Sequence, residues 1–79
     1  METTAVEQLI EAGISGCKAQ VTGSGCDFEA TVISDDFVGK SLLQKQRLVM
    51  AAVKTQIASG ELHALSIKTF TPDEWNAKS

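Results

Sequence analysis

Two side chains in this sequence, Cys26 and His63, are of the types that ligate transition metals. Thiolate sulfur and imidazole nitrogen together suit zinc, copper or an iron–sulfur cluster. Cys26 is expected just after a hairpin turn and His63 at the start of the last strand, and side chains at such element ends reach solvent and partners. Two ligands do not close a tetrahedral metal site. From spacing alone, the favoured interpretation is a half-buried cysteine and a strand-end histidine without a ligand.

The second cysteine, Cys17, is predicted to lie far from Cys26. If the hairpin turns at Ser24, paired positions sum to about 48, so Cys17 lies opposite Thr31. The two cysteines are then about five strand residues apart, roughly 17 Å at ~3.3 Å per residue. A disulfide needs Cα atoms within about 7 Å. We therefore predict no Cys17–Cys26 bond and no shared metal, and we interpret Cys17 as a structural residue.

Three basic residues, Lys40, Lys45 and Arg47, have the chemistry to bind phosphate groups or an acidic protein surface. Such residues more often form the solvated side of a helix. The chain carries seven basic and ten acidic residues, a net charge of −3. Proteins that hold nucleic acid mainly through phosphate contacts are usually basic. The charge balance therefore favours a solvated face or a protein contact over nucleic acid.

The length of 79 residues limits the chain to one small domain, residues 1–79, which cannot contain a dinucleotide-binding fold. The sequence has no Walker motif and no recognisable Ser-His-acid set, so we predict that the chain is not an enzyme. Residues 1–4 do not resemble a secretory signal. The longest apolar run, residues 48–53, is far short of the ~20 residues that span a bilayer. We therefore expect a cytoplasmic protein whose cysteines are thiols.

Alternation of apolar and polar residues predicts three strands, and the first two are joined by a turn at Gly23-Ser24-Gly25. These strands are expected at residues 18–22, 27–34 and 63–70. The faces that they are predicted to bury carry Ala19, Val21, Phe28, Ala30, Val32, Leu65 and Ile67.

Three helices are predicted from capping residues and helical spacing. The first begins at a capping box, Thr4-Ala-Val-Glu7, and ends at the glycines that follow. The second runs over residues 42–59 with Ser41 as its cap. Its apolar stripe is predicted to consist of Leu42, Leu43, Val49, Met50, Val53 and Ile57. A second capping box, Thr71-Pro-Asp-Glu74, starts a short terminal helix. The order α-β-β-α-β-α predicts an α+β domain of two layers, a three-stranded sheet with helices on one face.

Four segments of the sequence together resemble the BolA-like family, and the resemblance runs from about Glu7 to Trp75. They are Cys26-Asp-Phe28, the run from Phe37 to Val49, the run from Leu62 to Thr69, and Thr71-Pro-Asp-Glu-Trp75. Three linked motifs make the resemblance specific: the Phe-x-Gly-Lys connector, the His-Ala pair and the Thr-Pro-x-x-Trp ending. The resemblance implies the αββαβα arrangement already predicted, a relative of the class II KH fold.

The resemblance also implies a partner and a shared cofactor. BolA-like proteins pair with monothiol glutaredoxins, whose active-site cysteine and bound glutathione hold a [2Fe–2S] cluster. The BolA-like protein supplies a histidine just before its third strand, which is His63 here. It supplies a second ligand from the loop after its first strand, and Cys26 stands there, as in a Cys-type subgroup. Spacing alone favours no ligand role for Cys26 and His63, whereas the resemblance favours one, because two sulfurs from the partner complete the four ligands of the cluster. No cofactor is expected in the isolated chain.

Imidazole ligation is expected to loosen the shared cluster, which suits transfer or sensing better than storage. Because imidazole binds metal only when neutral, the cluster is expected to be less stable in acid. The expected function is therefore an accessory role in iron–sulfur cluster assembly, trafficking or sensing.

Some family members are described as transcriptional regulators of stress and cell-morphology genes, with a basic surface like that of a helix-turn-helix. Here Lys40, Lys45 and Arg47 would form such a surface. A KH domain grips nucleic acid with a Gly-x-x-Gly loop, whereas the nearest segment here, Gly39-Lys-Ser-Leu42, lacks the second glycine. Because of this departure, DNA binding is the alternative function and the iron–sulfur role is the favoured one.

Overall fold

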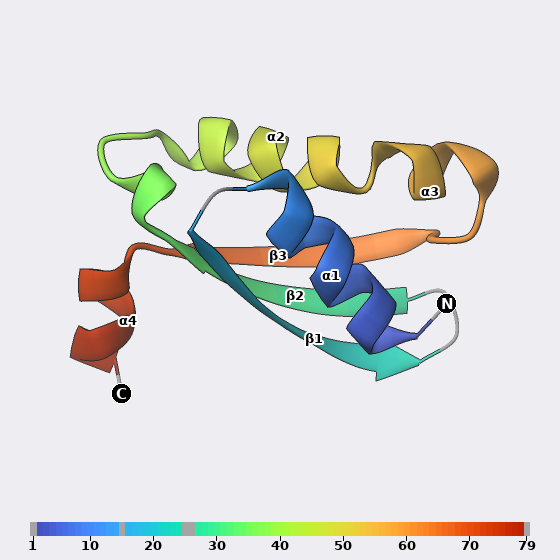
Figure 1. The fold of residues 1–79 in the computed structure, drawn as a ribbon, viewed down its shortest axis with the longest axis horizontal. Coiled ribbons are helices and arrows are strands. Elements are labelled where there is room, and N and C mark those ends of the chain that lie inside the picture. Colours follow the sequence, from blue (N-terminus) through green and yellow to red (C-terminus); the bar gives the residue numbers. More distant parts are fainter. Residues whose placement is uncertain (1, 15, 25–26, 79) are drawn as a thin grey trace.

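The computed structural model describes residues 2–14, 16–24 and 27–78, with the backbone alone at Ser24 and Ala64. It contains the predicted elements in the predicted order (Figure 1). They are α1 (Thr3–Gly13), β1 (Cys17–Ser24), β2 (Asp27–Ser34), the single 3-10 turn η1 (Asp35–Phe37), α2 (Leu42–Ala52), α3 (Lys54–Ser59), β3 (Ala64–Phe70) and α4 (Pro72–Lys78). Every helix in the described ranges is too short or too polar to cross a bilayer.

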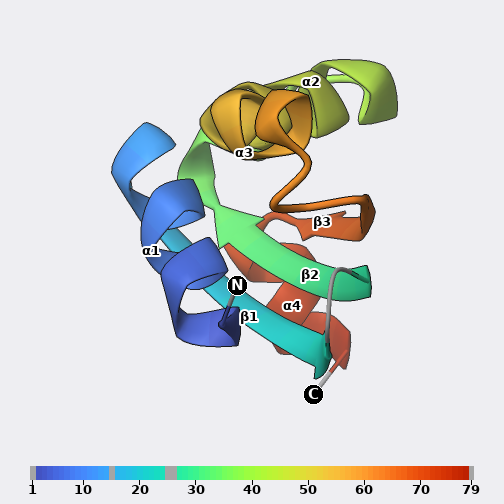
Figure 2. The same ribbon diagram turned by 90° about the vertical axis from the view of Figure 1, so that its right-hand side faces the viewer.

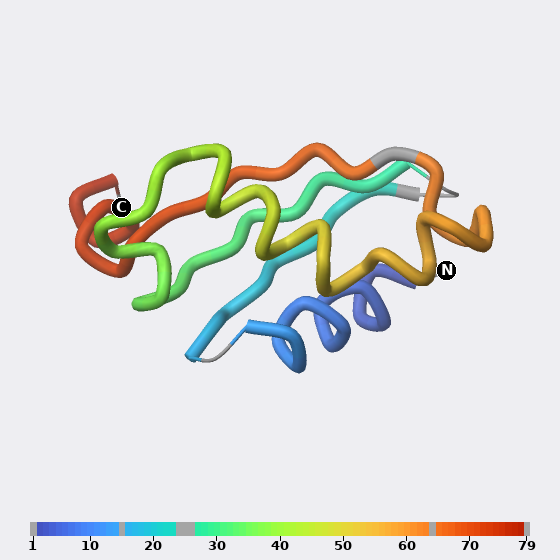
Figure 3. The backbone as a smooth tube through the Cα atoms, turned by 90° about the horizontal axis from the view of Figure 1, so that it is seen from above, coloured from blue at the N-terminus to red at the C-terminus, as the bar shows by residue number. Residues whose placement is uncertain are grey.

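The three strands form one sheet in the order β1-β2-β3. β1 and β2 are antiparallel, whereas β2 and β3 are parallel and are joined by the α2–α3 crossover. α1 and the α2–α3 pair lie on the same face of the sheet (Figure 2). α4 contacts β2 and β3 and lies at one end of the sheet, and the segment between α3 and β3 lies at the opposite end (Figure 3). The predicted two-layer α+β class is confirmed.

The hairpin register differs from the predicted one. Cys17 pairs with Ser34 and Ser24 pairs with Asp27, so paired positions sum to 51. The predicted pairing of Cys17 with Thr31 is therefore wrong. The cause is that β1 continues through Gly23 and Ser24, which the sequence pattern assigns to the turn. Cys17 lies at the end of the hairpin away from Ser24, and its thiol is free.

The core lies between the sheet and the helices that cover it. It is assembled from the alternate strand residues that the sequence predicts, together with buried residues of α1 and α2 and of the segments that connect the elements. Its fully or almost fully buried members are Val6, Ile10, Ile14, Ala19, Val21, Phe28, Ala30, Val32, Phe37, Val49, Val53 and Leu62. Leu65 and Ile67 of β3 are partly buried against this cluster, in agreement with the predicted alternation.

The predicted helix over residues 42–59 is two helices. α2 ends at Ala52, Val53 adopts φ −116° and ψ 14°, and α3 begins at Lys54. The Val53 N–H donates to the Met50 carbonyl three residues back, and its side chain is fully buried. Core packing at this β-branched residue therefore accompanies a break that helical spacing cannot reveal. The predicted end at Gly60 is confirmed, since this glycine adopts the left-handed conformation with φ 85°.

The predicted apolar stripe of the long helix is only partly buried. Val49 and Val53 are in the core, but Leu42, Leu43 and Met50 are 64%, 57% and 39% exposed. Leu42 shares a helix face with Val49 but lies in the first turn of α2, where no described element buries it. Leu43 and Met50 are each rotated about 100° from those two positions. The prediction that these three residues join the core is therefore wrong.

Two helix starts are confirmed and a third is corrected. Ser41 caps α2 in a reciprocal box with Gln44, and Thr71 forms the predicted box with Glu74. The predicted box at Thr4 and Glu7 does not form, because α1 begins at Thr3 and its cap position carries no side-chain hydrogen bond. Glu7 instead accepts a hydrogen bond from the Val21 N–H of β1 at 2.8 Å. Glu11 likewise accepts from the Ala19 N–H at 3.2 Å, so α1 covers the outer edge of β1.

Candidate functional site

His63 lies in the short segment that connects α3 to β3, directly before the first residue of that strand. Its side chain is exposed, whereas that of the preceding Leu62 is fully buried. The Leu62 N–H donates to the Gln56 carbonyl at 3.1 Å, which ties the segment to α3. A side chain at Gly60 would approach the His63 Nε2 atom to 4.0 Å. The imidazole is therefore presented to solvent from a backbone anchored on one side by the core and on the other by the sheet.

Cys26, the other predicted metal ligand, lies outside the described residues. The residue that follows it in sequence, Asp27, is described. Asp27, its successor, pairs in parallel with Ala64, the successor of His63. Asp27 also pairs with Ser24 across the hairpin. The strand starts that follow the two predicted ligands therefore lie side by side at one end of the sheet.

His63 is the only described member of the predicted ligand pair. Among residues 2–14, 16–24 and 27–78, no three His, Cys, Asp or Glu side chains gather closely enough to hold a metal ion. An exposed imidazole can ligate a metal through either ring nitrogen or transfer a proton. The end of the sheet at Asp27 and Ala64 is thus a place where one nitrogen donor is already oriented outward.

Cys17 occupies a different environment. Cys17 is the first residue of β1, and its side chain is half-buried next to the core. Burial, followed by the negative charge of Glu11, raises the pKa of its thiol from 9.0 to about 11. A thiol with a raised pKa is a poor nucleophile and a poor metal ligand at neutral pH, because the thiolate is the reactive form. These surroundings fit the structural role predicted for Cys17.

The three basic residues singled out from the sequence do not form one surface. The Lys45 side chain is 14% exposed, and its ammonium lies 3.9 Å from the Glu74 carboxylate of α4. The Lys40 ammonium donates to the backbone carbonyl of Asp36 within the connector that precedes α2. Arg47 is exposed on α2. Lys40 and Arg47 line a common shallow pocket of about 300 Å³, and Lys45 is not among its lining residues.

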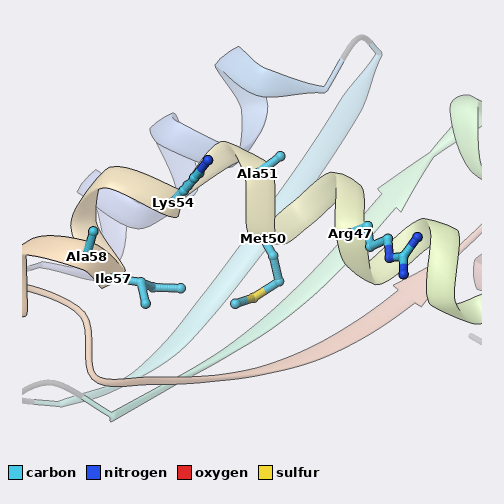
Figure 4. Close-up of a pocket in the computed structure, with 6 residues that line it drawn as sticks. All are labelled: Arg47, Met50, Ala51, Lys54, Ile57 and Ala58. Carbon is cyan, nitrogen blue, oxygen red and sulfur yellow. The ribbon is translucent and has the colours of Figure 1, made fainter.

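A second, adjoining pocket was missed by sequence reasoning. It encloses about 390 Å³ on the surface of α2 and α3 (Figure 4). Its lining residues are Arg47, Met50, Ala51, Lys54, Ile57 and Ala58. The signal was present in the sequence, because positions 47, 50, 51 and 54 follow the i, i+3, i+4, i+7 spacing of one helix face. Met50 and Ile57 were instead assigned to the core stripe, which concealed the pattern.

Comparison with known proteins identifies the family. The family model described as BolA-like protein matches residues 11–74. The chain belongs to the BolA-like family. This BolA-like chain is 32% identical to the acid stress protein IbaG of Escherichia coli K12, over 95% of this chain and 89% of that protein.

Solved structures agree with this assignment. A bolA protein homologue from Coxiella burnetii matches with a TM-score of 0.88 and 39% identity, covering 96% of this chain and 97% of that one. The BolA domain of SufE1 from Arabidopsis thaliana matches with a TM-score of 0.78 and 29% identity, covering 91% and 93% of the two chains. The αββαβα fold predicted from the resemblance is therefore that of the BolA-like proteins.

Proposed function

We propose that this BolA-like chain is a non-enzymatic accessory protein in iron–sulfur cluster assembly, trafficking or sensing. In this role it shares a [2Fe–2S] cluster with a monothiol glutaredoxin, and His63 and Cys26 are its two ligands. The glutaredoxin cysteine and its bound glutathione supply the other two. The family membership supports the class of function, and the ligand pair rests on the family motifs that the sequence carries at positions 26 and 63.

The parallel pairing of Asp27 with Ala64 is the observation that carries this proposal. The residues that directly follow the two predicted ligands in the chain are partners in the register of neighbouring strands. Ligands for one small cluster must come from one place on a protein surface. Asp27 and Ala64, 37 positions apart in sequence, are neighbours because β2 and β3 run in the same direction, and this supports a common site for the residues that precede them.

The donor set fits a shared cluster. A [2Fe–2S] cluster takes four ligands, and replacing thiolate by imidazole changes its reduction potential. The chain supplies one outward imidazole, and a thiolate at position 26 would make an N,S pair that leaves two positions for a partner. When bound, the cluster supplies one-electron redox capacity and transferable iron. The chain's own part is to hold His63 at the surface, which the buried Leu62 beside it and the hydrogen bond from the Leu62 N–H to the Gln56 carbonyl support.

Reconstitution tests the proposal directly. The chain is mixed with a monothiol glutaredoxin, glutathione, iron and sulfide, and the visible absorption of the complex is recorded. We expect a spectrum that differs from that of the glutaredoxin homodimer. His63→Ala and Cys26→Ala should each remove that difference or make the cluster at least about tenfold more labile. Lowering the pH should also labilise the cluster, because neutral imidazole is the ligating form.

Matched substitutions separate ligand loss from general damage. Cys17→Ala removes a thiol at the other end of the hairpin, and Ser66→Ala truncates an exposed residue of β3. Both should leave the spectrum unchanged. If His63→Ala and Cys26→Ala also leave it unchanged, the ligand assignment is wrong. If no complex with glutaredoxin forms, the proposed function itself fails.

DNA binding is the second candidate. The predicted basic surface is divided, since Lys45 is turned toward Glu74 and away from the pocket that Lys40 and Arg47 share. A regulator that relied on phosphate contacts would show tight binding that weakens steeply with salt. A gel shift with duplex DNA at two salt concentrations measures this. We expect no tight, salt-sensitive complex.

A further inference from the structure

Positive charge is concentrated in one part of this acidic chain. Residues 37–60 contain Lys40, Lys45, Arg47 and Lys54 and no aspartate or glutamate, whereas the remainder carries ten acidic and three basic residues. This cationic segment forms the connector, α2 and α3. The cations of this chain of net charge −3 are therefore concentrated in one segment, in which Lys45 is paired with Glu74 and Arg47 and Lys54 are exposed.

Two of these cations share a helix face with apolar side chains. Arg47, Met50, Ala51, Lys54, Ile57 and Ala58 line the larger pocket, and we call them the 47–58 face. Their numbers repeat an i, i+3, i+4 spacing twice, with Arg47 and Lys54 seven residues apart. Arg47 lies on α2, and Lys54 is the first residue of α3. Met50 and Ala51 lie between the two cations, and Ile57 and Ala58 lie beyond Lys54 (Figure 4).

The 47–58 face is available for a partner. Arg47, Ala51, Lys54 and Ala58 are exposed, and Met50 is 39% exposed. Neither Arg47 nor Lys54 has an ion-pair partner in the described part of the chain, unlike Lys45 and Lys68, which pair with Glu74 and Glu29. Exposed methionine flanked by arginine is typical of protein-binding surfaces, because methionine adapts its shape to the surface that covers it.

We propose that the 47–58 face binds an amphipathic helix of a partner protein that carries acidic residues seven positions apart with apolar residues between them. Charge complementarity selects this occupant. Carboxylates at that spacing meet Arg47 and Lys54, and apolar residues of the partner helix cover Met50 and Ala51 between them in the i, i+3, i+4, i+7 mode of helix recognition. His63 is not among the residues that line this face.

Other occupants fit this face less well. Nucleic acid gains affinity from many phosphate contacts, and this face offers two cations around an apolar strip. A second copy of the chain would have to supply an acidic helix. The glutamates of α1, Glu7 and Glu11, are four residues apart and are already bonded to β1. A different protein with an acidic amphipathic helix is therefore the better match.

The test uses a synthetic helical peptide of about 20 residues with glutamate at every seventh position beside a leucine-bearing face. Binding to the full chain is measured by fluorescence anisotropy, against a peptide in which lysine replaces each glutamate. We expect the acidic peptide alone to bind. Arg47→Glu or Lys54→Glu should weaken it at least about fivefold, because each converts an attractive pair into a repulsive one.

Lys18→Glu is the matched control, since it makes the same charge change at an exposed position of β1. It should alter the affinity by less than about twofold. Met50→Ala should weaken binding, whereas Leu43→Ala, which truncates an exposed residue outside the pocket, should not. The proposal is overturned if the acidic peptide does not bind or if Lys18→Glu weakens it as much as Arg47→Glu. Tighter binding of a duplex DNA that competes with the peptide would also overturn it.

Discussion

The same four-residue pattern, Thr-x-x-Glu, occurs at Thr4–Glu7 and at Thr71–Glu74, and the two copies behave differently. At the second copy the threonine hydroxyl and the glutamate carboxylate cap the start of α4 reciprocally. At the first copy the glutamate crosses to β1 and accepts the Val21 N–H. The glutamate joins a capping box where no unpaired N–H of a neighbouring strand lies within its reach. An unpaired strand edge next to the helix offers such a donor.

The largest effect is expected from Glu7→Ala. It leaves the Val21 N–H at a part-buried position without its carboxylate partner, and losing a charge-assisted hydrogen bond costs about 2 kcal/mol. It also opens the edge of β1 to pairing with another chain. Chemical denaturation should show the lost stability, and light scattering should show association. Gln8→Ala, an exposed change on the same helix, should do neither. An equal loss in both variants would contradict the edge-capping role.

Glu11→Ala is expected to cost about 1 kcal/mol, because its hydrogen bond to the Ala19 N–H is longer, at 3.2 Å. This change has a second readout. The Glu11 charge contributes to raising the pKa of Cys17 to about 11, so its removal should lower that pKa. The value should stay above 9.0, because burial is the larger cause. Thiol modification against pH in a Cys26→Ser background measures it, and an unshifted profile would contradict the charge effect.

For the glutamates, the larger loss of stability is expected at the first copy of the pattern. For the threonines, the larger loss is expected at the second copy. Thr71→Ala removes the cap of α4 and is expected to cost about 0.5–1 kcal/mol. Thr4→Ala is expected to change stability by less than about 0.5 kcal/mol, because no side chain caps α1. Denaturation curves of the two variants test this order. Similar losses would mean that Thr4 has a role in the folded protein that its position does not suggest.

The smallest effect is expected at Glu74 and depends on pH. Hydrogen bonds from the Thr71 backbone and side chain, with a smaller effect of Lys45, lower the pKa of Glu74 below its ordinary value. Its contribution to stability is therefore present above the unfolded pKa and is lost as the pH falls through the lower, folded pKa. Fluorescence of the single tryptophan, Trp75, should report looser docking of α4 in acid. Glu74→Gln should flatten that acid response, whereas Asp73→Asn should not.

Local patterns predicted much of the fold from sequence. The strand Asp27–Ser34 was predicted with its observed bounds, because its apolar and polar residues alternate and one face is buried. Ser41 and Thr71 were predicted as caps because their partners lie three residues away in the chain. The register of the hairpin, the break at Val53 and the exposure of Leu42 could not be predicted, since each depends on packing between elements distant in sequence.

The candidate site also has features that sequence motifs predict and features that depend on packing between distant elements. Cys26 and His63 stand out by residue type, but their predicted ligand role came from the family motifs, because spacing alone favoured no such role. That the strand starts after them are neighbours depends on the parallel pairing of Asp27 with Ala64, which no local pattern encodes. The 47–58 face has a readable helical spacing. It was missed because Met50 and Ile57 are apolar, and apolar helix residues are more often core than surface.

The parallel pairing of β2 with β3 also has a kinetic consequence. The β1–β2 hairpin closes a short loop and can form within microseconds. Asp27 and Ala64 meet only after the 36 residues between them have folded back over the sheet, and long loop closures slow folding. The end of the sheet that carries His63 is therefore completed late, when the crossover is already in place. If the proposed function holds, an incompletely folded chain would not bring the two proposed ligands together, and the proposed cluster binding should appear only when this end of the sheet is complete.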